Sequence, residues 1–192
     1  MPTAGRREAG PDRQLSSPGD TPDEESRARD LCLRQLTAAP RTAAQLTAAM
    51  ARRGFDERIA SRVLHRLTEV GLVDDAAFAE AWVGSRHAGR GLARRALGHE
   101  LRDRGVADPL VASALDGLDP EREVATARDL ATRKLAATRG MDATTRFRRT
   151  ASALARKGYS PELSYRVIRE VLESEGGSGG AELDATALDL DG

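Results

Sequence analysis

The chain has 192 residues, and its 30 basic side chains balance its 30 acidic ones, so the net charge is zero. Hydrophobic residues make up 40% of it, but aromatic residues only 3%. That composition favours a core of packed helices over a β-sandwich, which relies on aromatic and β-branched strands.

The single cysteine, Cys32, excludes an intramolecular disulfide and fits a reducing compartment. No apolar run approaches the roughly 20 residues of a membrane span, and the charged N-terminus lacks the apolar stretch of a secretion signal. We therefore expect a cytoplasmic protein that does not contact a membrane.

The two ends differ in composition from the middle. Residues 1–25 are rich in Pro, Gly, Ser, Asp and Arg, and cannot bury enough apolar surface to offset the entropy of ordering. Residues 175–192 combine a Gly-Gly-Ser-Gly-Gly linker with acidic residues and contain no basic one, whereas residues 121–173 hold twelve basic and seven acidic side chains. We predict a disordered N-terminal tail, and a flexible acidic C-terminal tail after a basic third of the chain.

Between the tails, one pattern occurs three times. Gly54, Gly105 and Gly158 lie 51 and 53 residues apart, and each follows Arg or Lys and precedes a large apolar residue. This arrangement is typical of a helix closed by a left-handed glycine with a Schellman contact. Counted from each glycine, the apolar positions are four before (Met50, Leu101, Leu154), one after (Phe55, Val106, Tyr159), five after (Ile59, Leu110, Leu163), ten after (Leu64, Leu115, Ile168) and thirteen after (Leu67, Leu118, Val171). The repetition predicts a tandem array.

In chain order, a first helix is predicted over 27–38. The second starts with a capping box from Thr42 to Gln45, and the third with Asp56 as its cap; it stops at Gly71. The second unit opens with a helix over 75–88, capped by Asp74 or Asp75. We assign Phe78, Trp82, Leu101 and Leu115 of this unit to its core, and the Gly89–Gly91 turn to a bend between helices.

The third unit opens with a helix over 120–139, where Asp119 precedes a proline suited to the first helical position. Its last helix opens in the same way at Ser160-Pro161-Glu162. The predicted fold is all-α: three tandem three-helix repeats that form an elongated, curved array with disordered tails. The predicted boundaries are 1–25 for the N-terminal tail, 26–73, 74–118 and 119–174 for the repeats, and 175–192 for the C-terminal tail.

Catalytic and metal-binding patterns are missing from the sequence. His65, His87 and His99 pair with no second His or Cys at a metal-ligand spacing, and we interpret them as surface or groove residues. No phosphate-binding glycine loop, nucleophile elbow or nucleophile–base pair is present. We expect no enzymatic activity, no cofactor and no metal.

Arginines are the most prominent functional candidates, since Lys134 and Lys157 are the only lysines. Several of them on one concave face would form a stripe that tracks phosphates, whereas the alternative is an ordinary solvated helix face; composition alone leaves both open. The chain has too few aromatic residues for a base-stacking ladder, so backbone or protein-surface binding is favoured over sequence-specific readout.

Residues 42–73 also fit a winged-helix DNA-binding regulator: a capped helix, a turn at Gly54, a longer helix and then Gly-Leu-Val. In such regulators a β-wing follows. Here Asp74-Asp75 is followed by a helical pattern, and two further copies of the unit are unexplained. A helix-turn-helix transcriptional regulator is therefore the alternative hypothesis.

The sequence resembles the RecX family of recombination regulators. The resemblance rests on Gly71-Leu72-Val73-Asp74-Asp75 with Phe78-Ala79, Trp82-Val83 and Arg86, then Glu100-Leu101 and Arg104-Gly105-Val106. It extends to Arg53-Gly54-Phe55 with Val63-Leu64 in the first unit and Lys157-Gly158-Tyr159 with Val167-Ile168 in the third. It covers about residues 27–173, and departs somewhat at Gly89-Arg90-Gly91-Leu92.

The resemblance implies a monomer that lies in the groove of the RecA filament on single-stranded DNA. It implies inhibition of RecA's ATPase, strand exchange and coprotease activity, and so a role in DNA repair, homologous recombination and the SOS response. Weak direct binding to DNA stays open. The residues we expect on the binding surface are Arg86, Arg90, Arg94, Arg95 and Arg102 in the middle unit and Arg146, Arg148, Arg149 and Arg156 in the third.

Overall fold

The computed structural model describes residues 22–176, and all regular structure in that range is helical. The helices are α1 (Pro22–Ala38), α2 (Ala43–Ala51), α3 (Glu57–Glu69), α4 (Asp75–Arg90), α5 (Arg94–Arg102), α6 (Asp108–Asp116), α7 (Pro120–Ala136), α8 (Ala143–Arg156) and α9 (Pro161–Gly176). The prediction of an all-α fold made of three three-helix repeats is confirmed.

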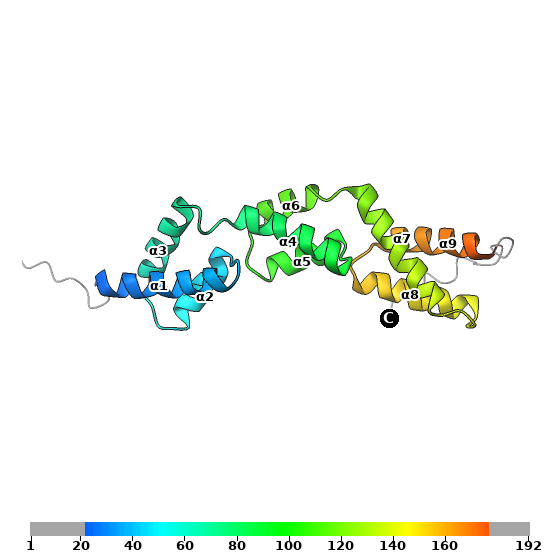
Figure 1. The fold of residues 1–192 in the computed structure, drawn as a ribbon, viewed down its shortest axis with the longest axis horizontal. Coiled ribbons are helices and arrows are strands. Elements are labelled where there is room, and N and C mark those ends of the chain that lie inside the picture. Colours follow the sequence, from blue (N-terminus) through cyan, green and yellow to red (C-terminus); the bar gives the residue numbers. More distant parts are fainter. Residues whose placement is uncertain (1–21, 177–192) are drawn as a thin grey trace, which may run out of the picture.

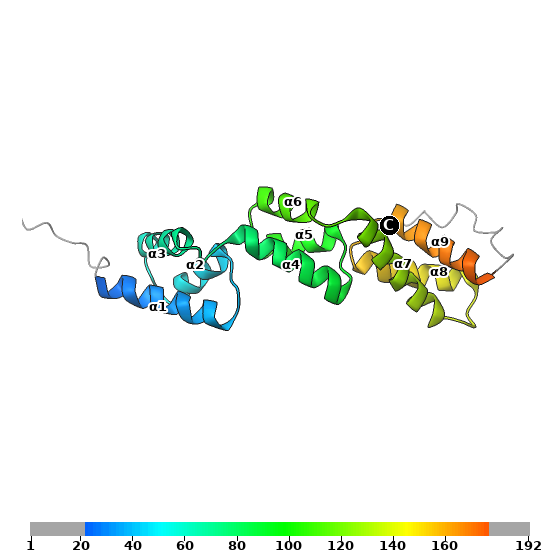
Figure 2. The ribbon, with the colours of Figure 1, turned by 45° about the horizontal axis from the view of Figure 1, so that its top comes forward.

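The repeats follow one another in an elongated row, with α1–α3 at one end and α7–α9 at the other (Figures 1 and 2). Helix pairs in extensive contact all fall within one repeat: α1 with α2 and α3, α4 with α5 and α6, and α7 with α8 and α9. Each repeat is therefore a packing unit of its own, and the contacts between repeats are local.

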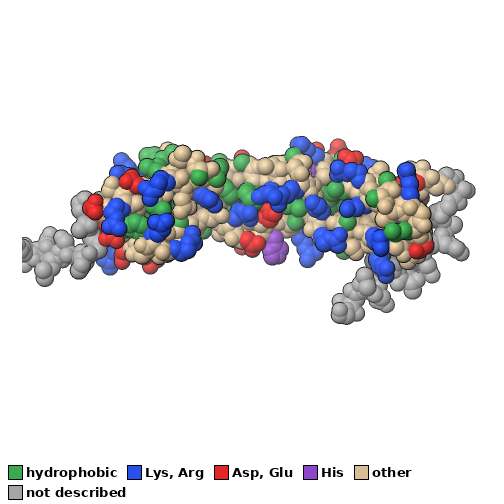
Figure 3. Space-filling view, turned by 60° about the horizontal axis from the view of Figure 1, so that its bottom comes forward, with side chains coloured by type: hydrophobic (Ala, Val, Ile, Leu, Met, Phe, Trp, Pro, Cys, Tyr) green, Lys and Arg blue, Asp and Glu red, His purple; other side chains and the backbone are tan. Residues whose placement is uncertain are grey.

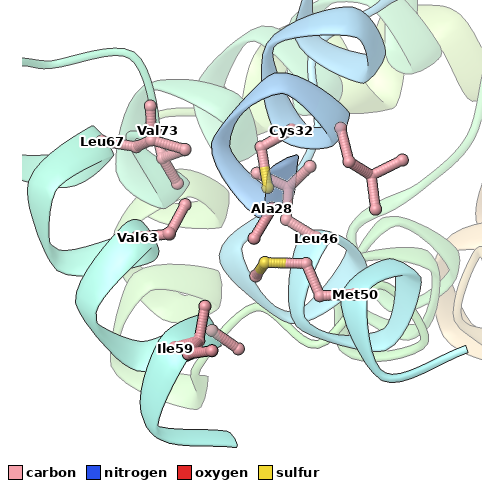
Figure 4. Close-up of a cluster of buried hydrophobic side chains, with 10 residues drawn as sticks. Ala28, Cys32, Leu46, Met50, Ile59, Val63, Leu67 and Val73 are labelled. Atoms are coloured by element: carbon pink, nitrogen blue, oxygen red, sulfur yellow. The ribbon is translucent and has the colours of Figure 1, made fainter. Parts of the chain in front are cut away.

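Each repeat has its own apolar core. In the first, Cys32 and Leu46 meet Met50, Val63 and Leu67 from the three helices (Figure 4). The residue four positions before each closing glycine is almost completely buried in all three repeats: Met50 at 0%, Leu101 at 0% and Leu154 at 1% exposure. The periodic apolar positions thus mark the cores, as predicted.

The predicted helix caps are also present. Thr42 and Gln45 form a complete capping box, and Asp56, Asp74 and Asp119 cap α3, α4 and α7 through their side chains. The closing glycines have positive φ angles, +79° at Gly54, +75° at Gly105 and +86° at Gly158. The amide after each glycine donates to the carbonyl of the buried residue four positions before it, at 3.2 Å in all three repeats, which completes the Schellman motif.

The ends of the described region differ from the prediction. Residues 22–25, assigned to the disordered tail, begin α1, because Pro22 suits the first helical turn and three acidic residues there favour the positive end of the helix dipole. Residues 175–176 end α9, where Glu175 pairs with Arg146 at 2.5 Å. The rest of both predicted tails lies outside the described residues.

The segment after Val73 and the helix that it forms bear on the function. Gly89 stays within α4, and Gly91, with a φ of +60°, ends that helix. The segment after Val73 forms α4 directly, so the wing that a winged-helix regulator requires is absent from residues 74–90. Within residues 22–176 no helix is both long and apolar enough to span a bilayer.

Candidate functional site

Positive charge is concentrated on the middle helix of each repeat. We define the middle-helix row as α2, α5 and α8, each continued to the residue before its closing glycine, that is residues 43–53, 94–104 and 143–157. The row has eleven basic side chains and two acidic ones, Glu100 and Asp103, whereas the first and third helices together have 14 basic and 17 acidic ones. Among the helices, unbalanced positive charge therefore belongs to this row.

The row follows the long axis of the molecule. Helices α2, α5 and α8 all reach the lower side of the ribbon in Figure 1. Figure 3 turns that side forward and shows Lys and Arg side chains along its whole length, with fewer Asp and Glu side chains among them. An elongated partner that carries negative charge at intervals would meet cations in each of the three repeats.

In repeats 1 and 2, the start of the middle helix binds the next repeat, including the end of its middle helix, through a recurring pair of hydrogen bonds. We call the contact between repeats 1 and 2 joint 1–2 and the contact between repeats 2 and 3 joint 2–3. At joint 1–2, the Thr42 hydroxyl donates to the Arg104 carbonyl (2.6 Å), and the Ala43 amide donates to the Asp75 carboxylate (2.9 Å). At joint 2–3, the Ala93 amide donates to the Lys157 carbonyl (2.9 Å).

The hydrogen bond from a backbone amide to a carboxylate also recurs at joint 2–3, where the Arg94 amide donates to the Glu123 carboxylate at 2.9 Å. In both joints the start of one middle helix thus binds the closing turn of the next repeat and an acidic residue of that repeat's first helix. The carboxylate satisfies a free amide and complements the helix dipole.

Close approach explains why the joints need glycine. A Cβ at Gly105 would lie 2.3 Å from the Ala44 Cβ, and one at Gly158 would lie 2.6 Å from the Ala96 backbone nitrogen. The equivalent Gly54, whose turn meets no further repeat, would find nothing within 4 Å. Gly105 and Gly158 therefore have two roles, a left-handed backbone and a contact surface, whereas Gly54 has only the first.

Four of the nine predicted binding residues are tied into the fold. Arg86 stacks on Trp82 and lies 3.6 Å from Glu100, and Arg102 pairs with Asp108 at 2.7 Å. Arg94 binds both carboxylate oxygens of Glu123 and the carbonyls of Leu115 and Leu118. Arg146 binds Glu175 and the Leu135 carbonyl. Of these, Arg94 and Arg146 have their guanidinium groups largely committed to packing.

The other five predicted residues have exposed side chains without an ion pair in the described part of the chain: Arg90, Arg95, Arg148, Arg149 and Arg156. On α8, Arg149 and Arg156 are seven positions apart and share one face. The nine residues do not form one cluster, since they are spread over α4, α5 and α8. What unites most of them is membership of the middle-helix row.

Sequence reasoning missed three arginines of the same row. Arg52 and Arg53 are exposed at the end of α2, and Arg104 lies over the Trp82 ring at the end of α5. The signal was available in the sequence, because sorting the charges by position within each repeat separates the middle helices from the other two. Summing charge over whole thirds of the chain hides it.

Of the two predicted places for the histidines, surface or groove, the structure excludes the surface for His87, which is only 3% exposed and lines a pocket with residues of α4, α6 and α7. Its Nδ1 lies 2.8 Å from the Leu92 carbonyl and its Nε2 3.0 Å from the Thr126 hydroxyl, so the ring links α4 to α7. The Cys32 thiol is buried, which raises its pKa and keeps it protonated. No group of three or more potential metal ligands occurs within residues 22–176.

Three family models match the chain, one per repeat. Residues 28–67 match the first three-helix domain of RecX, residues 74–115 the second and residues 121–168 the third. The Regulatory protein RecX of Thermobifida fusca is 60% identical over 151 residues, which cover 79% of this chain and 82% of that protein. The Regulatory protein RecX of Mycolicibacterium smegmatis is 42% identical over 177 residues, 85% of this chain and 94% of that protein.

Solved structures share the fold. A RecX from Lactobacillus salivarius superimposes with a TM-score of 0.72 at 19% identity, over 78% of this chain and 97% of that one. A second regulatory protein RecX gives a TM-score of 0.69 at 22% identity, over 77% of this chain and 72% of that one.

Proposed function

The chain belongs to the RecX family of regulatory proteins, and from that premise we propose that it binds the RecA–single-stranded-DNA filament and inhibits RecA's ATPase, strand exchange and coprotease activities. In this role it modulates DNA repair, homologous recombination and the SOS response. It acts in the cytoplasm as a monomer, and it works by binding rather than by catalysis.

The observation that carries the proposal is the segregation of charge. Eleven basic side chains and two acidic ones follow the middle-helix row through all three repeats. A filament on DNA is a long, regularly repeating partner that exposes phosphates and acidic side chains. Cations distributed along an elongated scaffold suit such a partner better than a compact cluster would, because each repeat adds contacts of the same kind.

The decisive experiment measures RecA's single-stranded-DNA-dependent ATPase rate while this protein is titrated in. The row variant carries Arg95→Glu, Arg149→Glu and Arg156→Glu; the matched control carries Arg58→Glu, Arg133→Glu and Arg166→Glu on the first and third helices. All six side chains are exposed and lack an ion pair in the described region, so the two variants differ in where the charge is reversed and not in how much.

We expect the row variant to need roughly tenfold more protein for half-inhibition, and the control to inhibit like the native chain, with equal helical content by circular dichroism. Inhibition well below one copy per RecA would indicate filament capping or propagated disassembly; inhibition only near equal amounts would indicate occupancy of the groove. Equal inhibition by both variants would refute the row as the binding surface. No inhibition by the native chain, with tight binding to duplex DNA, would favour the helix-turn-helix regulator instead.

A further inference from the structure

A cluster in the middle repeat has more hydrogen-bonding capacity than its packing uses. Trp82, the only tryptophan, is half-buried on α4. The guanidinium carbons of Arg86 and Arg104 lie 4.1 Å and 3.8 Å from its ring centroid. We name Trp82, Arg86 and Arg104 the Arg–Trp–Arg stack. It joins the first and middle helices of the repeat, because Arg86 lies on α4 and Arg104 directly follows α5.

Glu100 contacts all three residues of the stack. Its carboxylate accepts a hydrogen bond from the Trp82 indole nitrogen at 2.8 Å and lies 3.6 Å from the Arg86 Nε. Its carbonyl accepts from the Arg104 Nη1 at 2.6 Å. Both arginines are therefore positioned by stacking and by the same residue, which reduces the conformational entropy that they lose when they bind a ligand.

Comparison with Arg94 shows that Arg86 and Arg104 have unused N–H donors. Arg94 uses its side-chain nitrogens on Glu123 and on two backbone carbonyls, so its guanidinium is occupied. Arg86 and Arg104 each have one such contact, although a guanidinium has five N–H donors. Neither has a buried nitrogen without a partner, so their unused donors are open to solvent.

The charge of the stack is also incomplete. The Glu100 carboxylate lies within ion-pair distance of Arg86 alone, whereas Arg104 binds only the Glu100 backbone carbonyl, so within residues 22–176 the positive charge of Arg104 has no ion-pair partner. The two guanidinium carbons can be no farther apart than the sum of their distances to the ring centroid, which is about 8 Å. A ligand with two or more closely spaced anionic groups would satisfy both.

We propose that the Arg–Trp–Arg stack is a phosphate-binding site for the backbone of single-stranded DNA. Phe78 stacks on Trp82 at 5.6 Å and the two guanidinium groups lie over the ring, so little of the indole is left for base stacking. The free guanidinium edges match the geometry of phosphate oxygens, which Arg binds in bidentate fashion. A strand that places a phosphate every few ångströms supplies the closely spaced anions that the two arginines require.

This inference rests on the proposed function and deepens it, since it names DNA rather than RecA as the ligand of this part of the protein. Trp82 provides a direct reporter because no other tryptophan contributes to the fluorescence. The full chain, without RecA, is titrated with oligo(dT) at several salt concentrations, and its tryptophan emission is recorded. We expect a saturable, salt-dependent change in emission.

The test variants are Arg104→Gln and Arg86→Gln, with Arg104→Lys to retain charge without the bidentate geometry. Arg133→Gln, an exposed residue of α7, is the matched control. We expect each Gln variant to bind oligo(dT) roughly tenfold more weakly and to lower the slope of log affinity against log salt by about one, while the control leaves both unchanged. Arg104→Lys should restore part of the salt slope but not the affinity. Circular dichroism checks that each variant is folded.

Several results would overturn the proposal. Native binding of oligo(dT) by the folded Gln variants would remove the stack from the DNA contact. An equal emission change with poly-L-glutamate at the same charge concentration would indicate an acidic protein surface as the ligand. An unchanged Trp82 emission with oligo(dT), together with full inhibition of RecA's ATPase, would refute the DNA contact and leave the proposed function standing. The reverse pair of results would refute RecA inhibition and leave the DNA contact standing.

Discussion

The two joints between repeats use the same helix geometry but are tied with different strength. At joint 1–2, the side chain of Thr42 and the backbone of Ala43 make the polar contacts, to Arg104 and Asp75. Joint 2–3 has the equivalent pair and two further contacts across it: the Arg94 side chain binds Glu123, and His87 contacts Thr126. Repeats 2 and 3 are therefore fastened from several sides, and repeats 1 and 2 essentially along one line.

Two further contacts strengthen joint 2–3. The Tyr159 hydroxyl donates to the Gly91 carbonyl at 3.1 Å, and the Lys157 ammonium donates to the Arg90 carbonyl at 2.8 Å. Burial, with a smaller contribution from Glu123, raises the pKa of Tyr159, so its phenol remains a donor well into the alkaline range. The recurring hydrogen bonds between the ends of the middle helices therefore set the direction of the array. The additional side-chain contacts decide how firmly one repeat is held to the next.

The largest effect is expected for Gly158→Ala at joint 2–3. The new Cβ would meet the Ala96 backbone nitrogen and Cβ at 2.6 Å and 2.7 Å, at a φ of +86°. Left-handed strain and overpacking together should lower the free energy of unfolding by about 3–4 kcal/mol. Urea denaturation measures this value. Hydrogen exchange should show faster exchange in α8 and the start of α5 while α1–α3 stay protected, and uniform exchange across the chain would contradict a local joint.

Next in size is Arg94→Ala, which removes the main side-chain tie of joint 2–3. Glu123, only 14% exposed at its side chain, would keep the backbone amide of residue 94 but lose its cationic partner across the joint. Within repeat 2, the carbonyls of Leu115 and Leu118 would lose a donor. We expect a loss of about 3 kcal/mol in urea denaturation. Arg95→Ala, at the exposed neighbouring position, is the control and should change stability by less than about 0.5 kcal/mol. Similar losses for both would mean that Arg94 is not a tie.

The local elements of this fold could be predicted from the sequence because each is decided within a few residues. The capping box at Thr42 and the glycine after each middle helix involve neighbours in the chain, and both are where the pattern places them. The joints could not be predicted in the same way. Whether Gly105 contacts Ala44 depends on packing between residues far apart in sequence, and all three glycines have the same local signature although only two are in contact with another repeat.

Gly105→Ala tests the weaker joint. Its Cβ would lie 2.3 Å from the Ala44 Cβ but would meet no other atom closer than 3.8 Å, and few other contacts hold the repeats together there. Because the joint can open to relieve the clash, we expect a smaller loss than for Gly158→Ala, about 2 kcal/mol. Adding Ala44→Gly should recover part of that loss, which a double-mutant cycle in urea detects. Strict additivity of the two changes would rule out the contact.

The candidate site illustrates the same limit. The sequence identified arginines as the residues to examine, but not which of them are free. Arg94 and Arg95 are adjacent and chemically identical, yet one is bound to Glu123 and the other is exposed without an ion pair. Phase along a nine-residue helix and the position of the following repeat decide this difference. Trp82, predicted as a core residue, packs against the core of the middle repeat but is only half-buried, and two arginines cover part of its ring.

The smallest effect is expected for Gly54→Ala, which separates backbone strain from joint contact. Its φ of +79° is close to those of the other two closing glycines, but a Cβ there meets nothing within 4 Å. The substitution should therefore cost about 1 kcal/mol in urea denaturation, from the left-handed backbone alone. The amount by which Gly158→Ala and Gly105→Ala exceed this value then measures the closeness of each joint. If Gly54→Ala proved as destabilising as Gly158→Ala, the contact between repeats would contribute nothing, and the three turns would be equivalent helix ends rather than two joints and one free end.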